Sequence, residues 1–127
     1  MLDSSNATIT KLHEKPDAVG KVLIAFNRNP NFEVNSREWG WWEGYAEVGG
    51  VDVTLNQRVC RIYDSKGNIV YEYNTKFNGG DISANRLLMR WRKISIQDKG
   101  SLFTVAVYGE DANGNQVEAY AEVNLVN

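Results

Sequence analysis

Residues 102–125 read LFTVAVYGEDANGNQVEAYAEVNL and contain the complete pattern of a β-hairpin. Apolar residues occupy alternate positions on both sides of the segment from Asp111 to Asn115. An alternation with a period of two places such residues on one face of a strand. The Asp side chain can bond the backbone of its own turn, and Gly114 adopts a positive φ at little cost. This stretch therefore predicts two antiparallel strands joined by a short loop.

The same pattern recurs in five further segments, at 21–26, 41–48, 51–59, 69–77 and 87–91. The segments Asp64 to Asn68 and Asp98 to Ser101 repeat the Asp-to-Gly turn and predict two more hairpins. The strands after Val59 and Trp91 change phase by one residue, as a β-bulge does. We therefore predict an all-β fold, an antiparallel, meander-rich β-sandwich or small β-barrel of about seven to nine strands.

The chain has 127 residues, so we expect residues 1–127 to form a single all-β domain. Residues 1–19 fit either a short strand at 7–12 or a poorly ordered arm. Cys60 is the sole cysteine, which excludes an intramolecular disulfide, and we interpret it as a small, semi-buried hydrophobe. No signal-peptide pattern and no apolar run of roughly 18 residues is visible. We expect no membrane partner and a cytoplasmic or virion-associated location.

The segment from Trp39 to Tyr45 is the most unusual part of the sequence, because it holds three of the four tryptophans. Trp41 and Trp42 are adjacent in a predicted strand and must point to opposite faces. Trp42 continues an apolar series, so we predict that Trp42 lies in the core and that Trp41 lies on the polar face with Tyr45. We also expect Trp91 in the core.

An exposed Trp41 beside Tyr45 would form an aromatic platform for a sugar ring or another flat ligand. The long polar loop at 27–38 is a candidate binding edge. The predicted ligand-binding residues are Trp41, Tyr45, Trp39, Asn29 and Asn31. Two other interpretations of Trp41 stay open: burial in a sheet that is covered on both faces, and a position in an oligomer interface.

The net charge of −2 gives no reason to expect binding to a phosphate backbone. Arginines at 58, 61, 86, 90 and 92 can be read as a basic patch for single-stranded nucleic acid. Pairing with Glu72, Glu118 and Glu122 across neighbouring strands explains them more simply. We therefore expect no nucleic-acid partner.

The sequence offers no group of residues typical of catalysis. Glu43 with Glu47, and Glu118 with Glu122, lie about 13 Å apart along a strand, further than the roughly 5–9.5 Å of glycosidase pairs. His13 is the single histidine and supports neither a triad nor a metal site. The 111–118 segment has part of a calcium-loop spacing, which a hairpin turn explains equally well. We predict no catalytic residue, no metal site and no cofactor.

Two partial resemblances accompany these patterns. Residues 87–126, with Asp98-Lys99-Gly100 before an alternating strand and a hairpin, resemble the last three strands of an immunoglobulin-like domain. The cysteine pair of that family is absent, and Leu102 stands in place of its corner tyrosine. The meander from Trp41 onward, with its Trp-x-Gly opening, is similar to small lipocalin- or avidin-like barrels. Neither resemblance spans the chain by motif, and the sequence assigns no family.

These observations favour a non-enzymatic binding module that contacts a carbohydrate or another small molecule through surface aromatics. A structural or interaction subunit of a phage particle or surface assembly, with self-association, is the first alternative. A lipocalin-like carrier of an apolar ligand is the second. Fold class alone does not choose among them.

Overall fold

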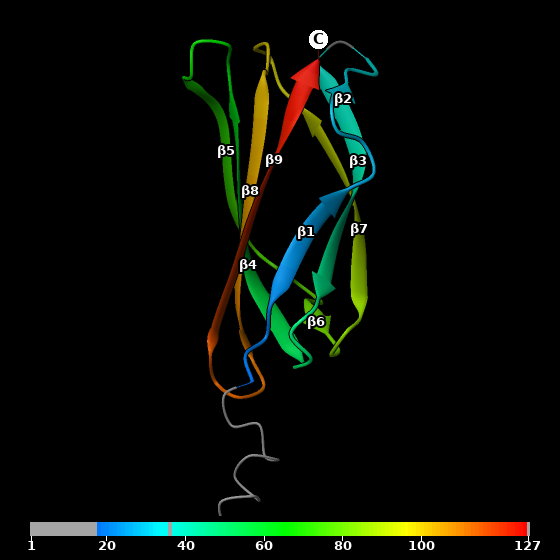
Figure 1. The fold of residues 1–127 in the computed structure, drawn as a ribbon. Coiled ribbons are helices and arrows are strands. Elements are labelled where there is room, and N and C mark those ends of the chain that lie inside the picture. Colours follow the sequence, from blue (N-terminus) through cyan, green and yellow to red (C-terminus); the bar gives the residue numbers. More distant parts are fainter. Residues whose placement is uncertain (1–17, 36, 127) are drawn as a thin grey trace, which may run out of the picture.

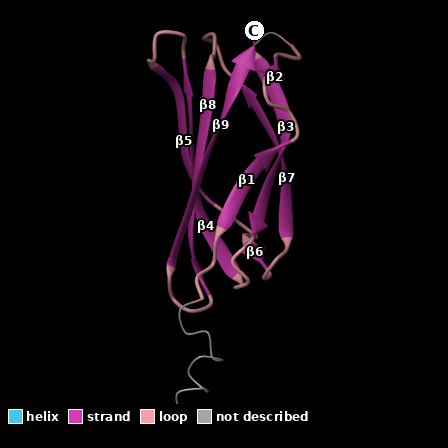
Figure 2. Ribbon diagram, in the orientation of Figure 1, coloured by secondary structure: helices cyan, strands magenta, loops and turns pink. Residues whose placement is uncertain are grey.

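The computed structural model describes residues 18–35 and 37–126, and this part of the chain forms nine strands and no helix (Figures 1 and 2). The strands are β1 (Val22–Phe26), β2 (Asn31–Phe32), β3 (Glu38–Glu47), β4 (Val53–Tyr63), β5 (Ile69–Lys76), β6 (Asp81–Ile82), β7 (Leu87–Ser95), β8 (Leu102–Asp111) and β9 (Gln116–Val126). The predicted all-β fold is confirmed. No helix that could cross a membrane occurs within these residues. His13 and most of the predicted arm at 1–19 lie outside the described residues.

The strands form two sheets that pack face to face as a sandwich (Figure 1). The small sheet has the order β1-β3-β7, and the large sheet has the order β2-β9-β8-β4-β5 with β6 paired to β4. All pairs are antiparallel except β2 with β9. β1 lies against β9 on one side of the sandwich. On the other side the edge strands are β5 and β7.

Two of the three predicted hairpins are present. β4 and β5 pair through the turn at 64–68, and β8 and β9 pair through the turn at 111–115. The hairpin predicted at Asp98 to Ser101 is wrong, because this segment leads from β7 in the small sheet to β8 in the large sheet. A turn sequence reverses the chain, but it does not choose which strand the next one pairs with.

The core lies between the two sheets. The large sheet supplies aliphatic side chains from β4, β8 and β9, and the small sheet supplies mainly rings. Trp41 packs edge-on against Phe103 of β8, with 4.8 Å between ring centroids, and Tyr45 packs against Phe77 at 5.0 Å. Each such burial contributes roughly 1.5–3 kcal/mol through removal of apolar surface from water. The predicted inward series of β9 and the burial of Cys60 are both observed.

The bulge predicted after Val59 lies earlier in β4. Register with β8 shifts between Leu55 and Gln57, which leaves Asn56 as the extra residue. From that point Arg58, Cys60 and Ile62 face inward. An arginine thereby takes a core position that the aliphatic pattern had assigned to Val59.

The predicted orientation of the tryptophans is wrong. Trp41 is only 2% exposed and lies in the core, whereas Trp42 is 44% exposed and Trp91 is 48% exposed on the outer face of the small sheet. The alternation itself was correct, but the inward series of β3 carries the carboxylates of Glu43 and Glu47. Because the prediction took the face of β3 with the two glutamates as the solvent-exposed one, it assigned the core to the wrong face of this strand.

Two buried carboxylates hold loops together. Glu47 accepts backbone N–H bonds from five residues, namely Lys21, Gly49, Gly50, Val51 and Asn85. Asp111 accepts N–H bonds from Gly20, Asn113 and Asn115. These bonds, that from Gly20 above all, lower the pKa of Asp111 to about 2. The 111–115 turn thus uses its aspartate as a structural anchor.

Candidate ligand-binding cleft

The structure separates the five residues predicted to bind a ligand. Trp39, Trp41, Tyr45 and Asn31 are buried, and Asn29 is exposed in the loop before β2. The Trp39 indole donates to the Val126 carbonyl at 3.3 Å, which ties β3 to the end of β9. These side chains form no common surface platform. Trp41 and Tyr45 do meet, but inside the sandwich, at the carboxylate of Glu43.

Glu43 is fully buried and is the centre of a hydrogen-bonded network. Arg58 of β4 binds it in a bidentate manner, with Nε 2.9 Å from Oε2 and Nη2 3.0 Å from Oε1. The Trp41 indole donates to Oε1 at 3.0 Å, and the Tyr45 hydroxyl donates to Oε2. A charge this deeply buried is tolerated only when paired in this way.

The pKa values in this network follow from its contacts. Burial disfavours the charged form of Glu43, but the hydrogen bonds and charge of Arg58, with the bonds from Tyr45 and Trp41, outweigh it and lower the pKa. Burial and the neighbouring Glu43 charge raise the pKa of Tyr45, so its hydroxyl stays protonated. Burial opposes the charge on Arg58, yet its bonds to Glu43 raise its pKa. Glu43 and Arg58 therefore form a stable ion pair and are not a proton-transfer couple.

Arg92 of β7 extends the network toward the side of the sandwich between β5 and β7. Its Nη2 donates to the Tyr45 hydroxyl at 2.8 Å, and its Nε lies 3.6 Å from Glu43 Oε2. That Nε is buried and has no hydrogen-bond partner. The guanidinium also lies over the Phe77 ring, 5.5 Å from the centroid. The contacts with Tyr45, Glu43 and Phe77 thus hold Arg92 in place, while its side chain stays partly exposed to solvent.

A cleft opens at this position, between the two edge strands. Its volume is about 270 Å³, and its walls come from β4, β5, β7 and the segment after β5: Arg58, Tyr73, Thr75, Lys76, Phe77, Asn78, Arg90 and Arg92. An adjoining hollow of about 240 Å³ shares three of these residues and adds Cys60, Tyr71, Trp91, Lys93 and Ile94. We call the two together the β5–β7 cleft. It combines five cations with four aromatic rings and has no acidic residue in its lining.

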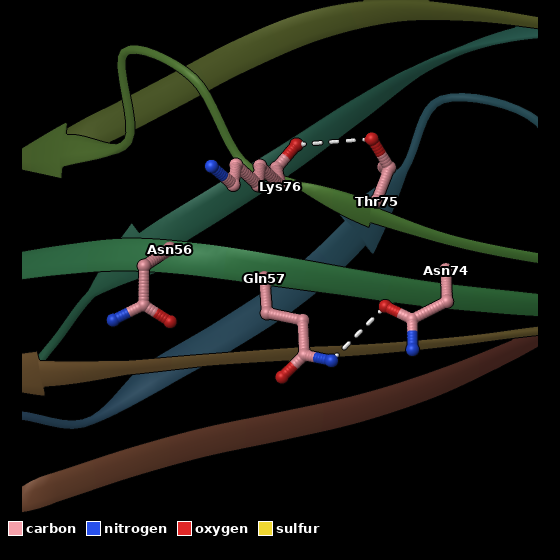
Figure 3. Close-up of a pocket in the computed structure, with 5 residues that line it drawn as sticks. All are labelled: Asn56, Gln57, Asn74, Thr75 and Lys76. Atoms are coloured by element: carbon pink, nitrogen blue, oxygen red, sulfur yellow. Dashed lines mark hydrogen bonds between the residues drawn. The ribbon is translucent and has the colours of Figure 1, made fainter.

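A second depression lies beside the β5–β7 cleft and has a different chemistry (Figure 3). Asn56 and Gln57 of β4 face Asn74, Thr75 and Lys76 of β5 across about 470 Å³ of open space. The Gln57 amide donates to the Asn74 side-chain oxygen at 3.0 Å, and Asn56 comes from the bulge of β4. Thr75 and Lys76 line both hollows. Amides of this kind suit the hydroxyl groups of a ligand that extends outward.

Sequence reasoning missed the cleft because it placed the arginines on the solvent face. Arg90 and Arg92 do share one face, as the alternation predicts, but that face is the inner one. Of the expected pairings with glutamates, Arg61 with Glu72 is present across β4 and β5. The available signal was Arg58, which stands two residues before Cys60 and four before Ile62 in one inward series. No cluster of three or more metal-ligating side chains is found among the residues described.

Comparison with protein-family models and with curated proteins found no match. Comparison with solved structures found similar folds. A putative ApaA protein from Bordetella pertussis matches with a TM-score of 0.61 at 10% identity, over 84% of this chain and 95% of that one. A structural-genomics target matches with a TM-score of 0.57 at 13% identity, over 84% of each chain. Red sea bream transglutaminase matches with a TM-score of 0.53 at 8% identity, over all of this chain and 20% of that one. At these identities the likeness extends to the β-sandwich fold alone.

Proposed function

We propose that this chain is a non-enzymatic binding module and that the β5–β7 cleft holds a small anionic ligand, such as an acidic saccharide. The observation that carries the proposal is the charge of the lining. Five cations line the cleft, namely Arg58, Lys76, Arg90, Arg92 and Lys93, and two carboxylates outside the lining pair with them: Glu43 with Arg58, and Glu38 with Lys93. The surplus positive charge at a concave, ring-lined surface attracts a carboxylate, sulfate or phosphate group.

Contacts behind the cleft hold its arginines in place, and this leaves the arginines oriented to bind a ligand. Glu43 fixes Arg58 and positions Arg92, so little rotamer entropy is lost when Arg92 binds an anion. Arg90 is held from the other side, because its Nη2 donates to the Gly79 carbonyl at 2.7 Å. Tyr73 lies between the two hollows and offers a ring face for stacking against a sugar. This arrangement accounts for both the charge and the flat shape of the proposed ligand.

Isothermal titration calorimetry with three anionic probes tests the proposal: an oligogalacturonate, a heparin-derived tetrasaccharide and inorganic phosphate. The oligogalacturonate has a matched neutral control, its methyl ester. We expect binding of at least one anion and none of the ester, with an affinity that falls as salt rises. Equal binding of acid and ester, or no binding of any anion, would contradict the proposal.

Substitution then locates the site. Arg90→Gln removes one half-buried cation of the cleft and is expected to weaken anion binding about tenfold, as a charge-assisted hydrogen bond contributes about 1.5–3 kcal/mol. Arg86→Gln is the matched control, since Arg86 is exposed in the turn before β7 and lines neither hollow. An equal effect of the two substitutions would place the anion elsewhere on the protein.

A further inference from the structure

The outer face of the small sheet is apolar and largely uncovered in the described structure, where the guanidinium of Arg28 lies over one end of it, 6.0 Å from the Trp91 ring centroid. Six of its large side chains are about half exposed: Leu23, Trp42, Val48, Leu87, Met89 and Trp91. Cross-strand register arranges this face in three rows, which are Leu23–Ala46–Leu87, Ala25–Gly44–Met89 and Trp42–Trp91. No charged residue stands within the three rows. We call this surface the β1–β3–β7 face.

Two glycines of β3 make the face flat. A Cβ at Gly40 would come within 2.9 Å of the Trp91 ring, and a Cβ at Gly44 would come within 3.0 Å of the Met89 sulfur. The side chains of β7 therefore lie down across β3 and do not stand up from the sheet. Trp91 also packs edge-on against Trp42, with 5.6 Å between centroids. The result is a continuous surface in which rings and methyl groups lie side by side.

The size of the face indicates what covers it. At about 200 Å² for a fully exposed large side chain, the six half-exposed residues present on the order of 600 Å² of apolar surface. A patch of that size is at the upper limit for a monomer. Two such faces packed together would bury about 1,200 Å², which reaches the range of stable protein interfaces. A second copy of this chain supplies the required area by itself.

We propose that the β1–β3–β7 face is the interface of a two-fold symmetric dimer. A two-fold axis that runs across the strands through the middle row exchanges the two outer rows. It sets Trp42 against Ala46 of the partner subunit, and Trp91 against Leu87 of the partner subunit. The tryptophan row then packs on a row with a small residue at its centre. This complementarity of one face with itself is what an isologous interface needs.

The charges around the face fix how the dimer responds to salt. Lys21 lies at one end, and Arg28 and Lys93 lie at the other, where Lys93 Nζ is 3.1 Å from Glu38 Oε2. A two-fold partner brings the two basic ends together, so screening of their repulsion strengthens the dimer. Ligand binding in the β5–β7 cleft has the opposite salt dependence. Trp91 and Lys93 border both surfaces, but the opposite salt responses distinguish the failure of one proposal from the failure of the other.

Sedimentation velocity of the full-length chain over a wide concentration range tests the dimer. We expect a monomer–dimer equilibrium that shifts toward dimer as salt rises. Met89→Lys puts a charge in the middle row of both copies and is expected to weaken the dimer about 100-fold, because an unpaired charge is costly to bury. Tyr120→Lys is the matched control: Tyr120 is 62% exposed on the outer face of the large sheet, and its substitution leaves the dimer unchanged.

A chain that stays monomeric at every concentration would overturn the proposal, as would a dimer that Met89→Lys and Tyr120→Lys affect alike. Circular dichroism of both variants shows whether each keeps its β-sheet fold. Acrylamide quenching of tryptophan fluorescence adds a second readout. Trp42 and Trp91 are expected to become shielded with rising protein concentration. Shielding of both tryptophans in a chain that sediments as a monomer would instead assign the cover to the chain's own residues 1–17.

Discussion

Strands β3 and β9 alternate with equal regularity, but they bury opposite kinds of side chain. β9 follows the usual rule, with small and branched apolar residues inside and Glu118, Tyr120 and Glu122 outside. β3 reverses the polar part of the rule: Glu43 and Glu47 are inside with Trp41 and Tyr45, while the outer face carries Trp42, two glycines and an alanine. Both strands belong to one sandwich and face the same core.

The difference shows that burial follows satisfied interactions and not polarity alone. Each inward carboxylate of β3 has a full set of donors, which are Arg58, Trp41 and Tyr45 at Glu43 and backbone N–H groups at Glu47. Such a carboxylate no longer depends on water. The outward face of β3 is apolar because, in our proposal, a second copy of the chain covers it. A small sheet can thus bury two carboxylates beside its inner rings and still present Trp42 and Trp91 on its outer face.

The largest test of this comparison concerns the adjacent tryptophans of β3. Trp41→Ala is expected to lower the free energy of unfolding by about 3–5 kcal/mol, because it leaves a cavity against Phe103 and removes a donor to Glu43. Trp42→Ala is expected to cost about 1 kcal/mol or less in the monomer. Urea unfolding at low protein concentration measures both. Equal losses would mean that the two rings are buried alike.

A second test compares inward and outward glutamates. Glu43→Gln keeps the side chain's shape but leaves Arg58 buried without its counter-charge, and we expect a loss of about 3 kcal/mol. Glu118→Gln on the outside of β9 should change the stability by no more than about 0.5 kcal/mol. The measurement is again urea unfolding at neutral pH. A Glu43→Gln variant as stable as the wild type would show that the ion pair is dispensable to the fold.

The smallest test concerns pH. Burial opposes the charge on Glu47, but its backbone N–H bonds, that of Asn85 foremost, hold the pKa of Glu47 below its ordinary value of 4.5. A group with a lowered folded-state pKa stabilises the protein above its ordinary pKa and loses that contribution as pH falls. Stability should therefore decline below about pH 4.5, and less steeply in Glu47→Gln. Chemical unfolding across acidic pH checks this. An unchanged slope in the variant would exclude Glu47 as a source of acid sensitivity.

Much of the fold could be predicted because strand patterns and turns are local. Residues 102–125 form the β8–β9 hairpin that their alternation and their Asp-to-Gly turn predict. The turn at Asp98 failed as a hairpin because the partner of β8 is β4, which lies some 40 residues earlier in the chain. Pairing across such a distance depends on how the two sheets pack, and no local pattern records it.

The candidate site was not predictable from the same patterns. The β5–β7 cleft joins residues from β4, β5 and β7, and two of its arginines, Arg58 and Arg92, face inward toward the buried carboxylate of Glu43. The bulge at Asn56 sets the phase that turns Arg58 inward. An arginine in an alternating strand is normally assigned to solvent, and that assumption misplaced the whole cationic lining.

The sequence by itself determined that this protein is an all-β domain with regular alternation, because the period of two and the Asp-to-Gly turns act within a few residues. It also determined which residues share a face in β3 and β9, but not in β4, where the bulge at Asn56 changes the phase. For β3, and for β4 after its bulge, only the tertiary structure decided which face is the core, since that choice depends on partners from distant strands. In β3 the face with Glu43 lies in the core. Arg58, Trp41 and Tyr45 together satisfy the buried charge of Glu43, which no single neighbour in sequence could satisfy.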